Sequence, residues 1–238
     1  MKIIDVEAWD RKVPYKNFVR YNNPIFSLAA RLDVTSVYER SKRTGRSFFS
    51  DFLFLVTASL NRVESLRLRM DNEGRVVLYE SIDPSFIVMQ ENGVIATCRT
   101  PFTEDYEAFY QAVREGISRK SSMEDVIEEF NSKDATPDVF YSTCLPWLDF
   151  VSMSNPYHYE DVAASSIPRL SWGKFVDEGG RRRLTFDIAA HHALLDGKAI
   201  CDGFAVMSAV LEKGDAFFEA PKESLDEICA SLGIFDKL

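Results

Sequence analysis

The chain has 238 residues, of which 46% are hydrophobic and 27% charged, a composition typical of a globular protein with ample material for a core. Its formal net charge is -9 and its longest basic run is Arg181-Arg182-Arg183, which disfavours nucleic acid as a partner. No apolar run approaches the ~18 residues that span a bilayer and no signal peptide is evident, so we expect a cytoplasmic protein with no membrane partner. The cysteines lack CxxC spacing, and we expect their thiols to be reduced.

The first half of the chain alternates between helical and strand-like patterns. Ser50 is the expected N-cap of a buried helix over residues 50–61, which is apolar nearly all round. Downstream of Thr103, apolar positions with a 3–4 spacing predict an amphipathic helix. Three strand-like runs lie between these two helices, at residues 75–80, 85–90 and 94–99.

The second half is predicted to contain a long hairpin followed by helices. Two glycines in the turn 177–180 supply the positive φ that a tight antiparallel connection needs. The pattern predicts a short helix near residues 123–130, a strand over 139–144 that stops at Pro146, hairpin strands over 169–176 and 183–190, a helix from Gly197 to Glu212 and a terminal helix over 224–232. Elements mixed in this way predict a layered α+β or α/β domain, with a single domain over 1–220 and a helical C-terminal extension over 221–238.

The sharpest chemical signal is the segment His-His-Ala-Leu-Leu-Asp-Gly at residues 191–197, between a predicted strand and a predicted helix. Histidine accepts a proton at neutral pH, so it can serve as a general base. A lone histidine on an apolar segment is usually a core residue, whereas an adjacent pair followed by aspartate and glycine is much rarer by chance. We therefore interpret this segment as catalytic, with a purely structural role as the alternative.

The same segment contains the ligand types of a two-histidine, one-carboxylate metal site, namely His191, His192 and Asp196. Adjacent residues that leave a strand point to opposite faces, so the two histidines are not expected to share a metal. The third histidine, His158, lies in a polar loop that either closes over a site or faces solvent. We therefore predict no metal.

With these residues in place, the chain resembles the chloramphenicol acetyltransferases, members of the coenzyme A-dependent acyltransferases that share His-x-x-x-Asp. The resemblance runs from about residue 5 to about residue 212, and its motifs arrive in the family's order. Besides the histidine pair, these motifs are Trp9-Asp10-Arg11, Phe26-Ser27-Leu28, residues 65–68, residues 81–86, Leu145-Pro146-Trp147 and residues 168–175. The resemblance implies an α/β fold, a two-layer sandwich of a mixed β-sheet with covering helices, in a homotrimer whose active sites lie between subunits.

The resemblance also implies that His192 is the general base. Its Nε2 would take the proton of an acceptor hydroxyl, whose oxygen attacks the thioester of acetyl-CoA directly, with no acyl-enzyme. Thr143 stands where the family has a serine that donates to the developing oxyanion, and Ser171 where a threonine holds a water. In such a trimer, His192 of one chain is expected to face Thr143 and Phe18 of the next.

Two further family residues are expected to shape the loop that carries the histidine. Asp196 matches a carboxylate that pairs with an arginine near the N-terminus, here Arg11. We interpret Asp196 as structural and not as a proton relay, and a buried pair of this kind costs about 3–5 kcal/mol to break on one side. Gly197 is expected to let the backbone turn into the following helix.

The binding residues implied by the resemblance match the family less closely. Lys174 and Phe175 stand where the family has a basic residue and an aromatic near the adenosine end of coenzyme A, with a solvated strand edge as the alternative for the lysine. Asn17 and Phe18 replace an aromatic pair on the acceptor face, and Lys198 replaces an aromatic residue after Asp-Gly. The expected acceptor is chloramphenicol or a similar small molecule; the alternatives are the same chemistry on another acceptor and a non-catalytic small-molecule-binding homologue.

Overall fold

The centre of the fold is one mixed β-sheet. The computed structural model describes residues 1–90, 93, 95–119, 137–158 and 160–236. Within these residues the sheet has seven strands: β2 (Ile25–Asp33), β5 (Asp83–Met89), β6 (Ile95–Arg99), β7 (Val139–Leu145), β8 (Arg169–Gly173), β9 (Val176–Glu178) and β10 (Arg181–His191). They lie in the order β2-β10-β8-β7-β5-β6, with β9 paired to β10. β7 runs parallel to β5 and to β8, and the other pairs are antiparallel.

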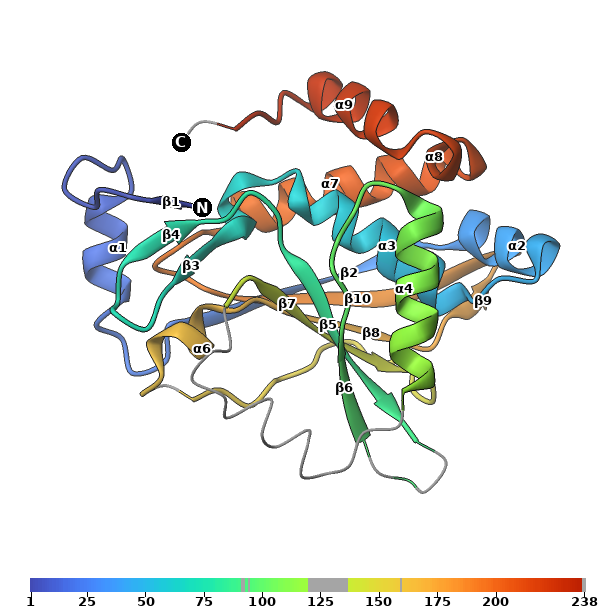
Figure 1. Ribbon diagram of the computed structural model, residues 1–238, viewed down its shortest axis with the longest axis horizontal. Helices are drawn as coiled ribbons and strands as arrows, with labels where there is room; N and C mark the ends of the chain where they lie inside the picture. Colours follow the sequence, from blue (N-terminus) through green and yellow to red (C-terminus); the bar gives the residue numbers. More distant parts are fainter. Residues whose placement is uncertain (91–92, 94, 120–136, 159, 237–238) are drawn as a thin grey trace.

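A smaller sheet at the N-terminal end of the molecule supports the residues that surround the histidine segment (Figure 1). Its strands are β1 (Lys2–Ile3), β3 (Leu68–Met70) and β4 (Val76–Leu78), in the order β1-β4-β3. Its apolar side chains form a cluster of their own, which includes Trp9 and Leu194. The N-terminal segment and the histidine loop are therefore packed into one small core, although they are far apart in the sequence.

Helices cover one face of the large sheet (Figure 1). Every residue of the central helix from Ser50 to Leu60 is buried, as its continuous apolar run requires. The helices are α1 (Lys12–Phe18), α2 (Thr35–Thr44), α3 (Phe48–Asn61), the 3-10 helix η1 (Glu64–Arg67), α4 (Tyr106–Ser118), α6 (Val162–Ser166), α7 (Gly197–Lys213), α8 (Asp215–Glu219) and α9 (Pro221–Leu232). The predicted two-layer α/β sandwich is confirmed. In the described part of the chain, no helix combines the length and the apolar character needed to cross a membrane.

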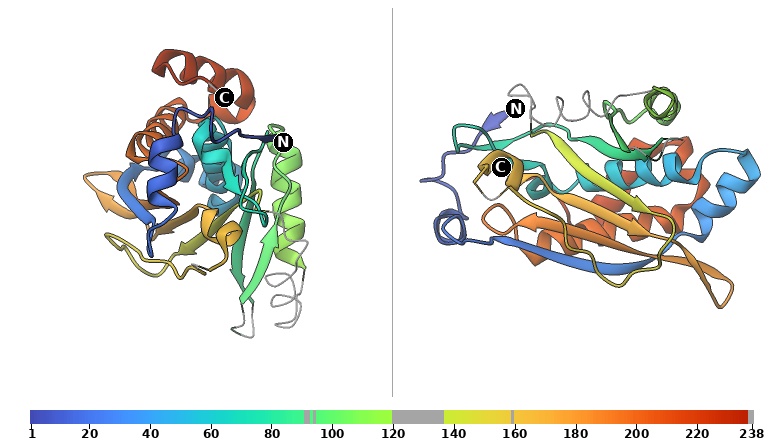
Figure 2. Two further views of the ribbon diagram at one scale, coloured as in Figure 1. Left: turned by 90° about the vertical axis from the view of Figure 1, so that its left-hand side faces the viewer. Right: turned by 90° about the horizontal axis from the view of Figure 1, so that it is seen from below.

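The irregular segment 146–158 crosses the face of the sheet opposite the helices (Figure 2). We call it the covering segment. Its Leu148 carbonyl accepts a hydrogen bond from the Lys174 backbone at 2.9 Å, and its Asp149 pairs with Arg31 of β2 at 2.6 Å. A Cβ on Gly173 would lie 2.6 Å from the Leu148 carbonyl oxygen, so only glycine permits this close approach. The segment therefore buries polar residues of the sheet that would otherwise face solvent.

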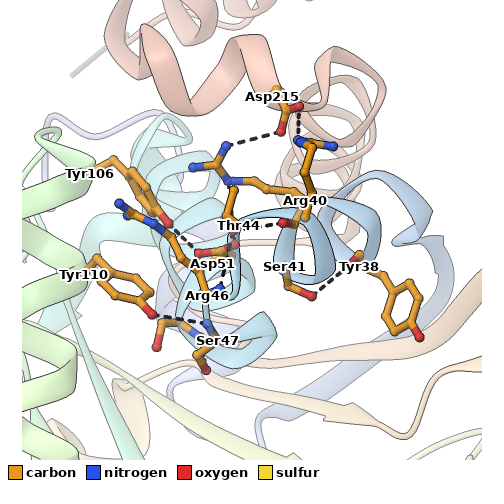
Figure 3. Close-up of polar contacts among 12 residues, drawn as sticks. Tyr38, Arg40, Ser41, Thr44, Arg46, Ser47, Asp51, Tyr106, Tyr110 and Asp215 are labelled. Atoms are coloured by element: carbon orange, nitrogen blue, oxygen red, sulfur yellow. Dashed lines mark hydrogen bonds and ion pairs between the residues drawn. The ribbon is translucent and has the colours of Figure 1, made fainter.

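A buried carboxylate ties together the helices at the far end of the sheet (Figure 3). Asp51 of α3 is fully buried, accepts a 2.5 Å hydrogen bond from the Tyr106 hydroxyl and lies 3.6 Å from the Arg40 guanidinium. Arg40 also pairs with Asp215 of α8 at 3.2 Å. Burial raises the pKa of Asp51, and burial followed by the hydrogen bond to Asp51 raises the pKa of Tyr106 to about 12.

Two predicted boundaries are wrong for local reasons. Ser47, not Ser50, caps α3, since Ser47 is extended and its hydroxyl accepts a hydrogen bond from the Ser50 backbone. The predicted strand over 169–176 is interrupted at Lys174 and Phe175, where the backbone bonds to the covering segment, and it forms β8 and β9 instead of one strand.

Other elements had weak or no signal in the sequence. β2, α1 and α2 were not predicted, and their sequences are rich in polar residues or alanine. The terminal helix begins at Pro221, before the predicted start, because proline suits the first turn of a helix. The predicted helix near residues 123–130 lies outside the described residues.

Candidate active site

The histidine pair lies at the end of the central strand β10, where a short loop begins. The backbone N–H of His192 donates to the Pro24 carbonyl at 2.9 Å, which ties the loop to the start of β2. Ala193, Leu194 and Leu195 are all buried, so three consecutive apolar side chains anchor the loop from inside. Asp196 then caps α7 by accepting a hydrogen bond from the Lys198 backbone at 3.2 Å.

The ring of His192 is held between aromatic side chains. Phe18 stacks on it with a centroid distance of 3.9 Å and an interplanar angle of 5°, and Phe26 lies at 4.5 Å. Its Nδ1 is 3.2 Å from the Leu195 carbonyl oxygen. A carbonyl only accepts, so this contact requires the proton on Nδ1 and leaves the lone pair on Nε2. The sequence places Phe26 in a motif but gives no signal that its ring contacts His192, and no signal for the contact with the Leu195 carbonyl.

Arg11 bridges the two ends of the loop. Its Nη1 is 2.6 Å from Asp196 Oδ2, and its Nη2 donates to the His192 carbonyl at 3.1 Å. The Arg11 side chain is 20% exposed and the Asp196 side chain 48% exposed. The expectation of a buried pair is therefore wrong, because Asp196 lies at the surface end of the loop. Water screens its charge, and breaking the pair costs less than the buried case.

His191, unlike His192, is buried. It is 4% exposed, and its Nδ1 accepts a hydrogen bond from the Ala193 backbone at 3.2 Å. Burial, and then the charge of His192, lowers the pKa of His191 to about 4, so the ring is neutral at physiological pH. His158 is exposed on the covering segment. Among the described residues, no three side chains of the metal-ligating types come together.

Thr143 and Ser171 lie in a different region of the sheet from His192. They are register neighbours on β7 and β8, and Ser171 in turn pairs with Asp187 of β10. His192 follows Asp187 by five residues, or about 16 Å at ~3.3 Å per residue along the strand. Within one chain the two hydroxyls are therefore far from the imidazole. The expectation that Phe18 faces the histidine of another chain is wrong, because Phe18 stacks on His192 of its own chain.

Asp187 is a buried acid that the sequence analysis did not single out. It is 1% exposed, lies beside Ser171 on the covered face and forms no ion pair with any described residue. Burial raises the pKa of its carboxyl to about 6, and a contact with Ser27 offsets this only in part. The signal in the sequence was a single acidic residue inside the apolar run 184–190.

Replacing Asp187 by asparagine is expected to stabilise the protein at pH 7. Below about pH 4 both folded and unfolded states bind the proton; between about pH 4 and 6 only the folded state does, so stability falls as pH rises through this window. The uncharged amide removes this penalty, and the free energy of unfolding should rise by up to about 3 kcal/mol at pH 7. Urea denaturation at several pH values between 5 and 8 measures the difference.

Asp33, on the neighbouring strand β2, provides a matched control. Burial alone would raise its pKa, but hydrogen bonds from Thr35 and Arg181 outweigh burial and lower it. Asp33→Asn should therefore reduce stability at pH 7, whereas Asp187→Asn increases it. A loss of stability in both variants would contradict the assignment of an unpaired acid at 187.

The predicted binding residues are dispersed around this framework. Lys174 is exposed, and the Phe175 ring packs between Tyr38 at 5.1 Å and Phe48 at 5.4 Å. Asn17 is exposed on α1 with its amide 3.5 Å from the Tyr21 hydroxyl, while its neighbour Phe18 faces His192. The structure thus brings Phe18, Arg11 and Asp196 to His192, and it places Lys174, Phe175, Thr143 and Ser171 elsewhere.

Comparison with known proteins identifies similar chains. The family model described as chloramphenicol acetyltransferase matches residues 1–212. The chain is 25% identical over 215 residues to the chloramphenicol acetyltransferase of Campylobacter coli, covering 88% of this chain and 98% of the relative. It is 26% identical over 206 residues to chloramphenicol acetyltransferase 3 of Escherichia coli, covering 85% of this chain and 90% of the relative.

The solved structures extend this similarity to three dimensions. A chloramphenicol acetyltransferase structure superposes with a TM-score of 0.79 and 27% identity, covering 87% of this chain and 97% of that one. The truncated catalytic core of the 2-oxoacid dehydrogenase multienzyme complex from Thermoplasma acidophilum superposes with a TM-score of 0.60 and 15% identity, over 90% of this chain and 98% of that one. The latter similarity concerns the fold alone.

Proposed function

Since the chain belongs to the chloramphenicol acetyltransferase family and is an acyltransferase, we propose a specific reaction for it. In this proposal it transfers an acetyl group from acetyl-CoA to a hydroxyl of chloramphenicol or a similar small molecule. The observation that carries the proposal is the orientation of His192. Its Nδ1 is occupied by the Leu195 carbonyl, and its ring plane is fixed by Phe18. Nε2 is therefore the basic nitrogen.

The proposed reaction uses this nitrogen as a general base. Nε2 takes the proton of the acceptor hydroxyl while the oxygen attacks the thioester carbonyl, and the Leu195 carbonyl stabilises the imidazolium that forms. When the tetrahedral intermediate collapses, the C–S bond breaks and the thiolate recovers a proton from Nε2. Arg11 and Asp196 position the loop and do not touch the reacting atoms. Proton transfer of this kind accelerates a reaction by about 100- to 10,000-fold.

The intermediate also needs a donor for its oxyanion, and in the proposal Thr143 supplies it. Ser171, whose hydroxyl is buried without a hydrogen-bond partner in the described chain, is suited to hold a water beside it. Since both residues are remote from His192 of the same chain, the proposal includes a homotrimer in which His192 of one copy meets Thr143 of the next. Exposed apolar residues on the covering segment, Trp147, Leu148 and Val151, support such an interface.

The proposed site for the adenosine end of acetyl-CoA is the break between β8 and β9. The ammonium group of Lys174 is exposed there and can pair with a phosphate group. Phe175 is fixed from behind by Tyr38 and Phe48, so it offers a rigid apolar surface to the adenine.

Release of coenzyme A thiol tests the proposed function. Purified protein with acetyl-CoA should release thiol faster on addition of chloramphenicol, and mass spectrometry should detect acetylated chloramphenicol. Size-exclusion chromatography with light scattering measures the assembly, for which we expect a trimer. If neither chloramphenicol nor a panel of alcohols accelerates thiol release, the proposal is wrong.

A further inference from the structure

Arg169 is a half-buried cation that forms no ion pair with any residue of the described chain. Every other described arginine that is not exposed pairs with a carboxylate or donates to backbone carbonyls. In the described chain, by contrast, the Arg169 side chain has no ion pair, and its buried Nε has no hydrogen-bond acceptor. A buried donor without an acceptor is unfavourable, so its presence calls for an explanation.

The rings of two tyrosines lie against the Arg169 guanidinium. Its Cζ lies 4.1 Å from the ring centroid of Tyr157 on the covering segment and 5.1 Å from that of Tyr141 on β7. Contact with aromatic rings occupies the flat faces of a guanidinium and leaves its N–H donors at the edge. The edge is the part that recognises carboxylate or phosphate, with two parallel hydrogen bonds.

The position of Arg169 places this edge beside the hydroxyl pair Thr143 and Ser171. Arg169 precedes Ser171 by two residues on β8, so both side chains point to the same face, about 7 Å apart along the strand. Tyr141 and Thr143 are related in the same way on β7, and each is the register neighbour of its counterpart on β8. A molecule bound at Thr143 therefore comes within reach of the guanidinium.

The guanidinium also makes no ion pair with the buried acid on this face. Asp187 and Arg169 are diagonal neighbours across β10 and β8 on this face, yet they form no ion pair. The contacts with Tyr141 and Tyr157 draw the guanidinium to the β7 side instead. Its positive charge is therefore not neutralised by the sheet.

From these observations we infer that the acceptor is a hydroxyl compound that carries an anionic group, a carboxylate or a phosphate, and that Arg169 binds this group. The inference rests on the proposed acetyl transfer and favours an acceptor other than chloramphenicol, which carries neither of these anionic groups. Arg169 acts in specificity, since it lies beside the group to be recognised and not at the reacting hydroxyl. In such an acceptor the anionic group would lie about 7 Å from the hydroxyl, which is the distance that two residues span along a strand.

A purely structural guanidinium in this fold has a different arrangement. Arg69 is fully buried, and its nitrogens donate to the carbonyls of Pro137, Leu66, Leu68 and Val139 at 2.7–2.8 Å. That side chain fastens segments of the chain through its hydrogen bonds. Arg169 has none of these bonds: it contacts the covering segment only through the Tyr157 ring, and its Nε keeps no acceptor in the described chain.

A matched pair of acceptors tests the inference. 4-(Hydroxymethyl)benzoate carries a carboxylate across a ring from its hydroxyl, and 4-(hydroxymethyl)benzamide has the same shape without the charge. Thiol release from acetyl-CoA should show a kcat/KM about 10- to 100-fold higher for the benzoate. Arg169→Met should abolish this preference by lowering kcat/KM for the benzoate alone, and Arg169→Lys should retain part of it.

The neutral acceptor separates specificity from folding. An Arg169→Met protein that still acetylates the benzamide at the wild-type rate is folded and active, so its loss with the benzoate belongs to the anion site. Equal use of both acceptors by the wild-type protein, or an equal loss with both in Arg169→Met, overturns the anion site and leaves acetyl transfer intact. Absence of thiol release with these acceptors and with chloramphenicol overturns the proposed function, and the inference with it.

Discussion

Replacing His192 by glutamine is expected to lower kcat/KM for acetyl transfer by about 100- to 10,000-fold, the range that a positioned general base supplies. Glutamine keeps a polar side chain of similar size but cannot accept the hydroxyl proton. His192 is half-buried, and its ring makes contacts with Phe18 and Phe26 and one hydrogen bond to the Leu195 carbonyl. The KM for acetyl-CoA and the thermal midpoint should therefore change little. Steady-state kinetics and thermal denaturation measure both quantities.

His158 supplies the control for this variant. It is exposed on the covering segment, and His158→Gln should retain the activity of the parent protein. His191 is unsuitable as a control, because it is buried and bonded to the Ala193 backbone. Full turnover by His192→Gln would exclude general-base catalysis by this residue.

Replacing Arg11 by methionine is expected to lower kcat by about 100-fold, with a small effect on stability. The guanidinium joins the Asp196 carboxylate to the His192 carbonyl, so its loss frees both ends of the loop. A displacement of about 1 Å at a reacting group can reduce the rate by about 100-fold. Because Asp196 is 48% exposed, the free energy of unfolding should fall by only about 1 kcal/mol or less.

Variants of Asp196 separate the ion pair from the helix cap. Asp196→Asn keeps an oxygen that can accept from the Lys198 backbone, and it should lower kcat about as much as Arg11→Met. Asp196→Ala also removes the cap and should lower the free energy of unfolding by a further ~1 kcal/mol. The double variant of Arg11→Met and Asp196→Asn should be no slower than either single variant, since both break one interaction.

Arg181 offers a matched surface arginine. It pairs with Asp33 at 2.8 Å and is 66% exposed, so Arg181→Met should leave kcat unchanged. A strictly additive loss in the double variant would show that Arg11 and Asp196 act separately. Unchanged kcat in Arg11→Met would show that the loop holds its shape without the guanidinium.

The fold explains why one chain holds only part of the proposed site. The central strand β10 carries Asp187 in the middle of the covered face and the histidine pair at its end. Thr143, Ser171 and Asp187 are register neighbours on β7, β8 and β10, and His192 lies about 16 Å from Asp187 along β10. A rigid sheet keeps this spacing, which is why our proposal includes a second copy of the chain.

Much of the site's chemistry was visible in the sequence. Local patterns determine short elements, and they correctly indicated the buried helix α3, the strand β7 and the loop between β10 and α7. The histidine pair at residues 191–192 and the acid that follows it were equally visible, because they are contiguous. The family resemblance added Arg11 as the partner of Asp196, and the two side chains lie 2.6 Å apart.

Only the tertiary structure decided which residues meet. Strand register and the direction of each side chain depend on pairing between segments far apart in the sequence, which no local pattern records. This pairing stacks Phe18 on His192 of the same chain and exposes half of Asp196. It also places Arg169 beside two tyrosines, with no counter-charge among the described residues. Residue type thus determined the available chemistry, and long-range packing determined where each group can act.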